Sequence, residues 1–135
     1  MSAVTRFFFR LPYTSRSTWD VIRWWETRRA AYNLAVGIAG LTSVAAVAVV
    51  STLPPHPPSF QVPWDAIVVY GILANLFFSF GPALDAAICR RWGSNYTAVG
   101  PALFRYGFAF AVGLTLLPIP LALIGWSLRL LGLVR

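Results

Sequence analysis

The sequence contains no lysine, one cysteine and one histidine, and only four acidic residues in a chain of 135. With Cys89 as the single cysteine, an internal disulfide is excluded, and with His56 as the single histidine there is no His–His or Cys–His metal cluster within one chain. The absence of lysine removes Schiff-base chemistry and the phosphate-binding motif G-x-x-x-x-G-K-[ST]. We therefore expect no enzymatic activity, no metal and no cofactor held by this chain alone.

Charge is missing altogether from three long stretches: Ala30–Leu53, Ala66–Leu84 and Tyr106–Leu128. As helices they extend about 36, 28 and 34 Å, and the hydrocarbon core of a bilayer is roughly 30 Å thick. Charged residues make up 11% of the chain and apolar residues 58%, which is a composition suited to lipid. We predict an all-α membrane protein with two regions. They are a cytoplasmic basic arm, residues 1–29, and a three-helix transmembrane domain, residues 30–135, with spans at about 30–53, 66–88 and 102–128.

The eleven basic residues are all arginines, and the segments between the apolar runs share them unevenly. Nine lie before the first run or between the second and third: Arg6, Arg10, Arg16, Arg23, Arg28, Arg29, Arg90, Arg91 and Arg105. Two follow the third run, Arg129 and Arg135, and the loop after the first run has none. Because arginines beside spans are retained on the cytoplasmic side, we predict a cytoplasmic amino terminus and an outside carboxyl terminus in the cytoplasmic (inner) membrane.

Six tryptophans lie at the ends of the apolar runs, and none lies in the middle of one: Trp19, Trp24, Trp25, Trp64, Trp92 and Trp126. Indole rings prefer the boundary between lipid and water, so we interpret these residues as interfacial anchors. The segment Pro118-Ile119-Pro120 leaves an alternative for the third run, because two prolines remove two backbone donors and kink a helix. A re-entrant segment turning back there would return the carboxyl terminus to the cytoplasm.

The arm before the first span has no signal-peptide pattern, because its only early apolar run is Phe7-Phe8-Phe9. From Ser17 onward the pattern predicts a capped helix, with Val21, Ile22 and Trp25 on one side. We expect an amphipathic helix in the cytoplasmic headgroup layer, with a plain extension of the first span as the alternative. The nearest partner of this basic arm is anionic lipid, and we expect no binding of nucleic acid.

Small and polar residues form a stripe on each of the first two spans. On a 100° wheel Asn33, Gly37 and Gly40 share one arc of the first span, and Gly71, Asn75 and Ser79 share one arc of the second. Small residues let transmembrane helices approach closely, and side-chain amides bond across the interface. We predict that these six residues serve helix packing or partner contact, and that the two stripes face each other.

Asp85 is the acid that the sequence places nearest to membrane depth, where a carboxylate is costly unless it is paired. If the second span bends at Gly81-Pro82 and continues to Cys89, Asp85 lies near the cytoplasmic interface. Its expected partner is Arg90, Arg91 or Arg105, and we name a buried ion pair with Arg105 as the candidate. The tetrapeptide Gly81–Leu84 recurs as Gly100–Leu103, and Pro101 is typical of a helix start.

The run Trp25–Leu34, together with Tyr70-Gly71, Asn75-Leu76 and Gly81-Pro82, resembles small uncharacterised multi-pass bacterial membrane proteins. This resemblance covers most of the chain, and its motifs are short. It implies a location in the bacterial cytoplasmic membrane, and it implies no activity and no site residue.

Two hypotheses for function remain at this level. The first is a non-catalytic accessory or structural subunit that packs against other integral membrane subunits, or against itself, in a larger complex. Contacts of its aromatic residues with a pigment or quinone of that complex stay open within this hypothesis. The second is a small oligomeric transporter or channel with a polar path near Asn75, Ser79 and Asp85.

Overall fold

The computed structural model describes residues 5–6, 17–55, 60–93 and 99–134. The main helices are α2 (Thr18–Thr52), α3 (Trp64–Trp92), α4 (Gly100–Leu116) and α5 (Pro118–Leu130), and the described residues include no strand. Some residues used in the predictions lie outside the described ranges: the run Phe7-Phe8-Phe9, Arg10, Arg16, His56 and Arg135.

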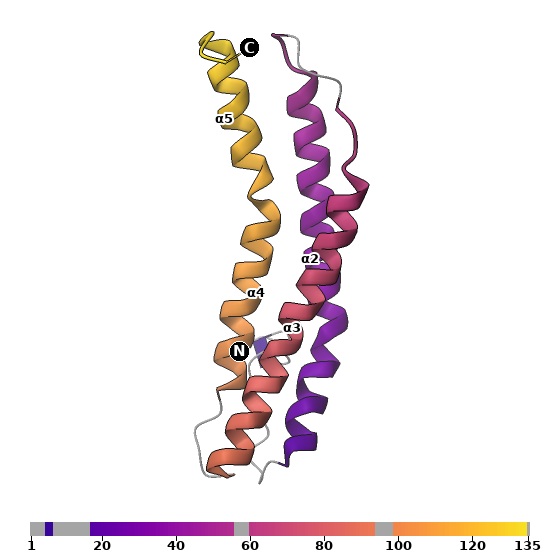
Figure 1. Ribbon diagram of the computed structural model, residues 1–135, viewed down its shortest axis with the longest axis vertical. Helices are drawn as coiled ribbons and strands as arrows, with labels where there is room; N and C mark the ends of the chain where they lie inside the picture. Colours follow the sequence, from indigo (N-terminus) through magenta and orange to yellow (C-terminus); the bar gives the residue numbers. More distant parts are fainter. Residues whose placement is uncertain (1–4, 7–16, 56–59, 94–98, 135) are drawn as a thin grey trace.

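The helices form an elongated bundle in which α3 runs opposite to α2, and α4 and α5 follow each other along one line (Figure 1). Three helical stretches are long and apolar enough to cross a membrane: Thr18–Thr52, Trp64–Trp92 and Gly100–Leu130. This confirms the prediction of an all-α chain with three such helices, and it indicates a multi-pass membrane protein.

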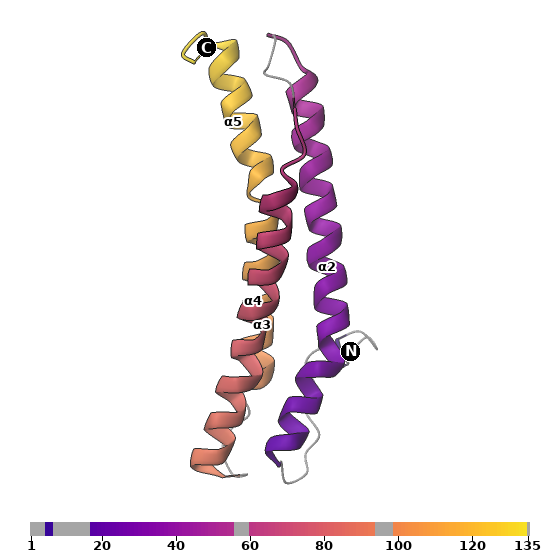
Figure 2. The same cartoon turned by 45° about the vertical axis from the view of Figure 1, so that its right-hand side comes forward.

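The chain does not turn back at the two prolines between α4 and α5, and the re-entrant alternative is therefore wrong for this structure (Figure 2). Pro118 is the first residue of α5, where a missing N–H is tolerated because first-turn donors have no partner within the helix. A tight turn at Leu117 carries the helix onward, since the Leu117 amide donates to the Leu114 carbonyl (3.3 Å).

The predicted interfacial helix is not a separate element, because residues 18–29 are the first three turns of the 35-residue helix α2. Ser17 caps this helix through a capping box with Asp20: each side chain accepts a bond from the other residue's backbone N–H (3.2 and 3.0 Å). Val21 and Trp25 are buried in the bundle. The plain extension of the first span is thus the alternative that the structure supports, since the apolar side of these turns meets other helices.

The buried faces of the helices repeat at intervals of three and four residues, which is the spacing of helices packed at a shallow crossing angle. On α2 this seam is formed by Val21, Trp25, Arg28, Tyr32, Val36, Ala39, Ser43 and Val50. On α3 it is formed by Ala74, Phe78, Pro82, Asp85 and Cys89, and on α4 by Gly100, Phe104, Ala111 and Thr115. No residue of α5 is buried, so the core lies in the half of the bundle where α2, α3 and α4 meet.

Candidate functional site

The most enclosed polar contact joins α2 to α3 at the arginine-rich end of the bundle. The indole Nε1 of Trp25 donates a hydrogen bond to Oδ2 of Asp85 (3.1 Å). Asp85 is only 1% exposed and Trp25 only 3% exposed. Because a buried carboxylate is stable only when it accepts hydrogen bonds, this indole is part of what allows an acid to sit inside the bundle.

Two glycines make room for this contact, and they are the first residues of the repeated tetrapeptide. A methyl group on Gly81 would overlap the six-membered ring of Trp25. A methyl group on Gly100 would overlap Oδ2 of Asp85. Gly81 lies in α3 and Gly100 begins α4, so each copy of Gly-Pro-Ala-Leu lets a different helix approach the Trp25–Asp85 pair.

Aromatic rings pack around the same pair within the described hydrophobic core. Trp25 packs edge-on against Phe78 of α3 and Phe104 of α4, with ring centroids 5.6 and 5.8 Å apart. Trp24 lies edge-on to Phe104, and Phe108 stacks on Phe104 (5.8 Å). Edge-to-face pairs of this kind contribute about 0.5–1.5 kcal/mol beyond the area that they bury. We call Trp24, Trp25, Phe78, Asp85 and Phe104 the tryptophan–aspartate cluster.

Two neighbouring arginines of α2 flank this cluster. Arg28 is buried, its guanidinium lies 3.8 Å from the ring centroid of Trp24, and its Nη1 donates to the Trp24 carbonyl (2.7 Å). Arg29 pairs with Glu26 through two bonds of 2.8 and 2.7 Å and also reaches Oγ of Ser79 on α3 (3.2 Å). Arginines placed over aromatic rings keep their charge with less water, so both can lie close to the apolar part of the bundle.

Nearer the middle of the bundle, hydroxyl groups link the helices to each other's backbone. Tyr32 donates to the Ala74 carbonyl (3.2 Å), and Ser43 donates to the Thr115 carbonyl (2.6 Å). The hydroxyl of Tyr70 donates to the Ala111 carbonyl (3.2 Å) and lies 2.6 Å from Oγ1 of Thr115. Side chains from α2 and α3 thus meet the last turn of α4, just before its proline-marked end.

The predicted small-residue stripes do not face each other across α2 and α3, although Ser79 accepts a hydrogen bond from Arg29 of α2 (3.2 Å). Asn33 and Gly37 are exposed, and Gly40 faces α4, where a methyl group on it would lie 3.7 Å from Cγ2 of Thr115. On α3, Gly71, Asn75 and Ser79 are partly buried; the Asn75 amide donates to the Gly71 carbonyl and the Ser79 hydroxyl to the Asn75 carbonyl. The amides therefore do not bond across the interface as predicted, because the seam of α2 is rotated by one residue from the stripe.

The predicted pairing of Asp85 with Arg105 is not formed between these two described residues. Arg105 is exposed, and its guanidinium lies 5.7 Å from the ring centroid of Tyr106. The ion pair found in the described part of the chain is that between Arg29 and Glu26. Asp85 is instead enclosed beside Trp25, which donates a hydrogen bond to it, and Gly100, whose backbone lies close to its Oδ2.

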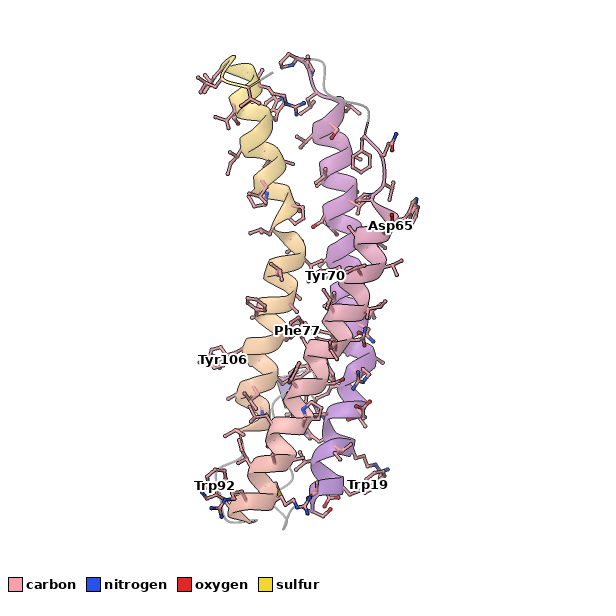
Figure 3. All side chains as sticks on the ribbon, in the orientation of Figure 1. Trp19, Asp65, Tyr70, Phe77, Trp92 and Tyr106 are labelled. Atoms are coloured by element: carbon pink, nitrogen blue, oxygen red, sulfur yellow. The ribbon has the colours of Figure 1, made fainter. Side chains whose placement is uncertain are left out.

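The six tryptophans fall into two groups. Trp19, Trp64 and Trp92 are 70%, 69% and 67% exposed, and Figure 3 shows Trp19 and Trp92 at the same end of the bundle. Trp24 and Trp25 are buried in the tryptophan–aspartate cluster, so the interpretation of these two as interfacial anchors is wrong. Trp126 is partly buried and donates its Nε1–H to the Pro54 carbonyl (3.1 Å), which ties α5 to the end of α2.

The residues that the sequence reasoning missed are Trp25, Tyr32 and Ser43 as seam residues of α2. The signal for them is present, since Trp25, Arg28, Tyr32, Val36, Ala39 and Ser43 follow the three-and-four spacing of a packed seam. The described residues include no group of three or more histidine, cysteine, aspartate or glutamate side chains that could hold a metal ion. What the site does chemically is to hold three helices together through buried hydrogen bonds.

Comparison of the chain with models of protein families, with curated proteins and with solved structures gives no match. The resemblance to small multi-pass bacterial membrane proteins therefore stays a prediction from the sequence.

Proposed function

We propose that this protein is a non-catalytic integral membrane subunit that packs against other membrane proteins in a larger complex. The observation that carries the proposal is the exposed position of Asn33 and Gly37 on α2. A glycine or asparagine that faces lipid contributes no favourable free energy. In contact with another helix, glycine allows the two backbones to approach closely and asparagine can form a hydrogen bond. Since α2 uses a different face for its own bundle, Asn33 and Gly37 lie on a side of α2 that a partner helix can approach.

The proposal is also supported by how little of the apolar surface the chain covers by itself. In the most apolar 18-residue stretch of each spanning helix, only 11% to 22% of the residues are buried. Large side chains such as Leu34, Leu41 and Phe110 are 66%, 75% and 71% exposed. Lipid accounts for most of this surface, and the stripe is the part of it whose composition favours protein.

We further propose a cytoplasmic amino terminus and an outside carboxyl terminus in a bacterial cytoplasmic membrane. The described arginines support this orientation. The start of α2 and the end of α3, which carry Arg23, Arg90 and Arg91, lie at one end of the bundle, and the end of α5, which carries Arg129, lies at the other (Figure 1). Arg28, Arg29 and Arg105 lie on the same half as the first group. Under the positive-inside rule the end with six arginines faces the cytoplasm.

The experiment is purification of the tagged protein from native membranes in a mild detergent, with crosslinking and mass spectrometry. Stoichiometric recovery of other integral membrane proteins is the expected result. Gly37→Leu should reduce recovery by at least fivefold because it blocks close approach at the stripe, and Ala45→Leu serves as control because Ala45 is an exposed small residue on another side of α2. A purely monomeric, partner-free protein would contradict the proposal.

The transporter hypothesis has less support from the side-chain geometry. The Asn75 amide and the Ser79 hydroxyl are bonded to carbonyls of their own helix, and Asp85 is enclosed by Trp25. A conducting path would need these groups to be turned toward a shared pore in an oligomer. Loss of a measured flux in Asp85→Asn with assembly intact would bring this hypothesis to first place.

A further inference from the structure

The second spanning helix is displaced along the bundle relative to the first. Tyr32 of α2 bonds to the carbonyl of Ala74 on the antiparallel helix α3. Asp65 lies nine residues before Ala74 (74 − 65), so it is level with about residue 41 of α2 (32 + 9), roughly 14 Å from Tyr32 along the axis. The uncharged run Ala30–Leu53 is centred close to residue 41. Figures 1 and 3 agree, since α3 begins well below the end of α2 and Asp65 lies there.

The contacts of the third spanning helix place Asp65 at the same depth in the membrane. Ser43 of α2 bonds to the carbonyl of Thr115, and Thr115 lies near the centre of the uncharged run Tyr106–Leu128. The first and third runs are therefore level with each other, while Asp65, in the first turn of α3, lies at about the middle of both. A bilayer that covers these two runs places the carboxylate of Asp65 at membrane depth.

At this depth the Asp65 side chain faces outward. Asp65 is exposed, and among the described residues its carboxylate makes no hydrogen bond or ion pair. Its neighbours on α3 are apolar and exposed, including Val68 and Val69 at 58% and 54%. An acid in hydrocarbon without a partner is strongly unfavourable, so acids at this depth face a partner group or water.

We propose that Asp65 binds a basic side chain on a transmembrane helix of a different membrane protein, which packs against the first turns of α3. This inference rests on the proposed function and names one of its contacts. Charge complementarity identifies the partner's group as arginine, lysine or histidine at the depth of Asp65.

In helices α2 to α5, a second copy of this chain offers no basic group at the depth of Asp65. A parallel copy would bring its own Asp65 to the same depth, where two acids repel each other. Of the described arginines, the one toward the outer end is Arg129, which lies fourteen residues beyond Thr115 (129 − 115), or roughly 21 Å away along the axis. The other arginines of these helices lie toward the start of α2, the end of α3 and the start of α4, in the opposite half of the bundle.

The test places a photo-crosslinking amino acid at Val69, one turn from Asp65 on the same side of α3, in cells that contain the native membranes. Leu114 provides the control position, because it is exposed at a similar depth on α4. We expect the Val69 adduct to contain a span of another protein with a basic residue. In an Asp65→Leu background this adduct should fall about tenfold, and in Asp65→Glu it should be largely retained.

The outcomes separate this inference from the proposed function. Adducts at Val69 with lipid alone or with a second copy would overturn the inference, and so would an adduct that Asp65→Leu leaves unchanged. If a complex is still purified equally well with wild type and Asp65→Leu, the proposed function stands while this contact fails. Helix content and the labelling rate of buried Cys89 verify that each variant folds, because Asp65 itself lies outside the core.

Discussion

Gly81→Ala tests the tryptophan–aspartate cluster with the smallest available change. The added methyl carbon would come closer than van der Waals contact to three ring atoms of Trp25, namely Cη2, Cζ3 and Cζ2. The ring is rigid, buried and bonded through Nε1 to Asp85, so it cannot turn away without breaking that bond. Gly71→Ala is the matched control, because Gly71 lies in the same helix and a methyl group there meets no atom within 4 Å.

The expected cost follows from two opposing effects. Overpacking a close-packed contact costs about 1–3 kcal/mol. Replacing glycine by alanine within a helix contributes about 0.5–1 kcal/mol in the other direction. The two ranges together leave a net destabilisation of about 0–2.5 kcal/mol. Because the clash is with a rigid, buried ring, we expect about 1–2 kcal/mol, or a melting temperature roughly 4–8 °C lower. Gly71→Ala should leave the melting temperature unchanged or raise it by a few degrees.

Cys89 provides the assay, because it is the single cysteine of the chain and is buried on the seam of α3. A fluorogenic maleimide follows its exposure as the detergent-solubilised protein is heated. The same glycine change is then made in a Trp25→Phe background, since phenylalanine lacks the outer ring that the methyl group would meet. In the Trp25→Phe background Gly81→Ala should not lower the stability. The difference between the two backgrounds then corresponds to a coupling free energy of at least about 1 kcal/mol. Equal effects of Gly81→Ala in both backgrounds, or of Gly81→Ala and Gly71→Ala, would refute the packing argument.

Three further predictions use the same protein preparation or its membranes. Ser43→Ala should destabilise the bundle by about 0.6–2 kcal/mol in the Cys89 assay, because it removes the hydrogen bond to the Thr115 carbonyl. Thr42→Ala is the control and should change the stability little, because Thr42 bonds to Ile38 of its own helix. Equal losses of stability in the two variants would contradict this prediction. Asp85→Leu should lower the stability by about 1–3 kcal/mol, because it leaves the Trp25 indole without this acceptor. Asp85→Asn keeps an acceptor oxygen and should lower the stability less. A less stable Asp85→Asn than Asp85→Leu in thermal denaturation would contradict the role of this hydrogen bond. In a Cys89→Ala background, a membrane-impermeant maleimide should label Leu133→Cys from the outside and Ser17→Cys only in inverted vesicles. The opposite pattern would reverse the orientation.

The sequence was sufficient to predict where the helices lie, because uncharged runs and proline positions are local signals. Pro118 shows the limit of such signals. Two prolines allow either a turn or a continuing helix, and the choice depends on whether the freed carbonyls and the kink fit neighbouring helices. In the structure the last turn of α4 is held by Ser43 and Tyr70, and α5 continues in the same direction.

The faces of the helices were harder to predict than their positions. In lipid, small and polar residues favour protein contact without saying which protein is contacted, and Asn33 and Gly37 could belong to the inner seam or to an outer surface. The seam of α2 instead contains large residues such as Trp25 and Tyr32, which the sequence placed at the lipid boundary or left unassigned. Their hydroxyl and indole groups find partners on α3, and this depends on the register between two distant segments.

The register of α3 could not be derived from helix lengths, and the connection between α2 and α3 explains why. Eleven residues separate Thr52 from Trp64, and five of the chain's ten prolines lie between Pro54 and Pro63. A polyproline-type chain advances about 3.1 Å per residue, so eleven residues can reach about 34 Å. A short loop would have forced α3 to begin at the level where α2 ends. This connection is long enough to begin α3 about 15 Å lower, at the depth of Asp65, and the contacts of Tyr32 and Trp25 then determine the level that is adopted.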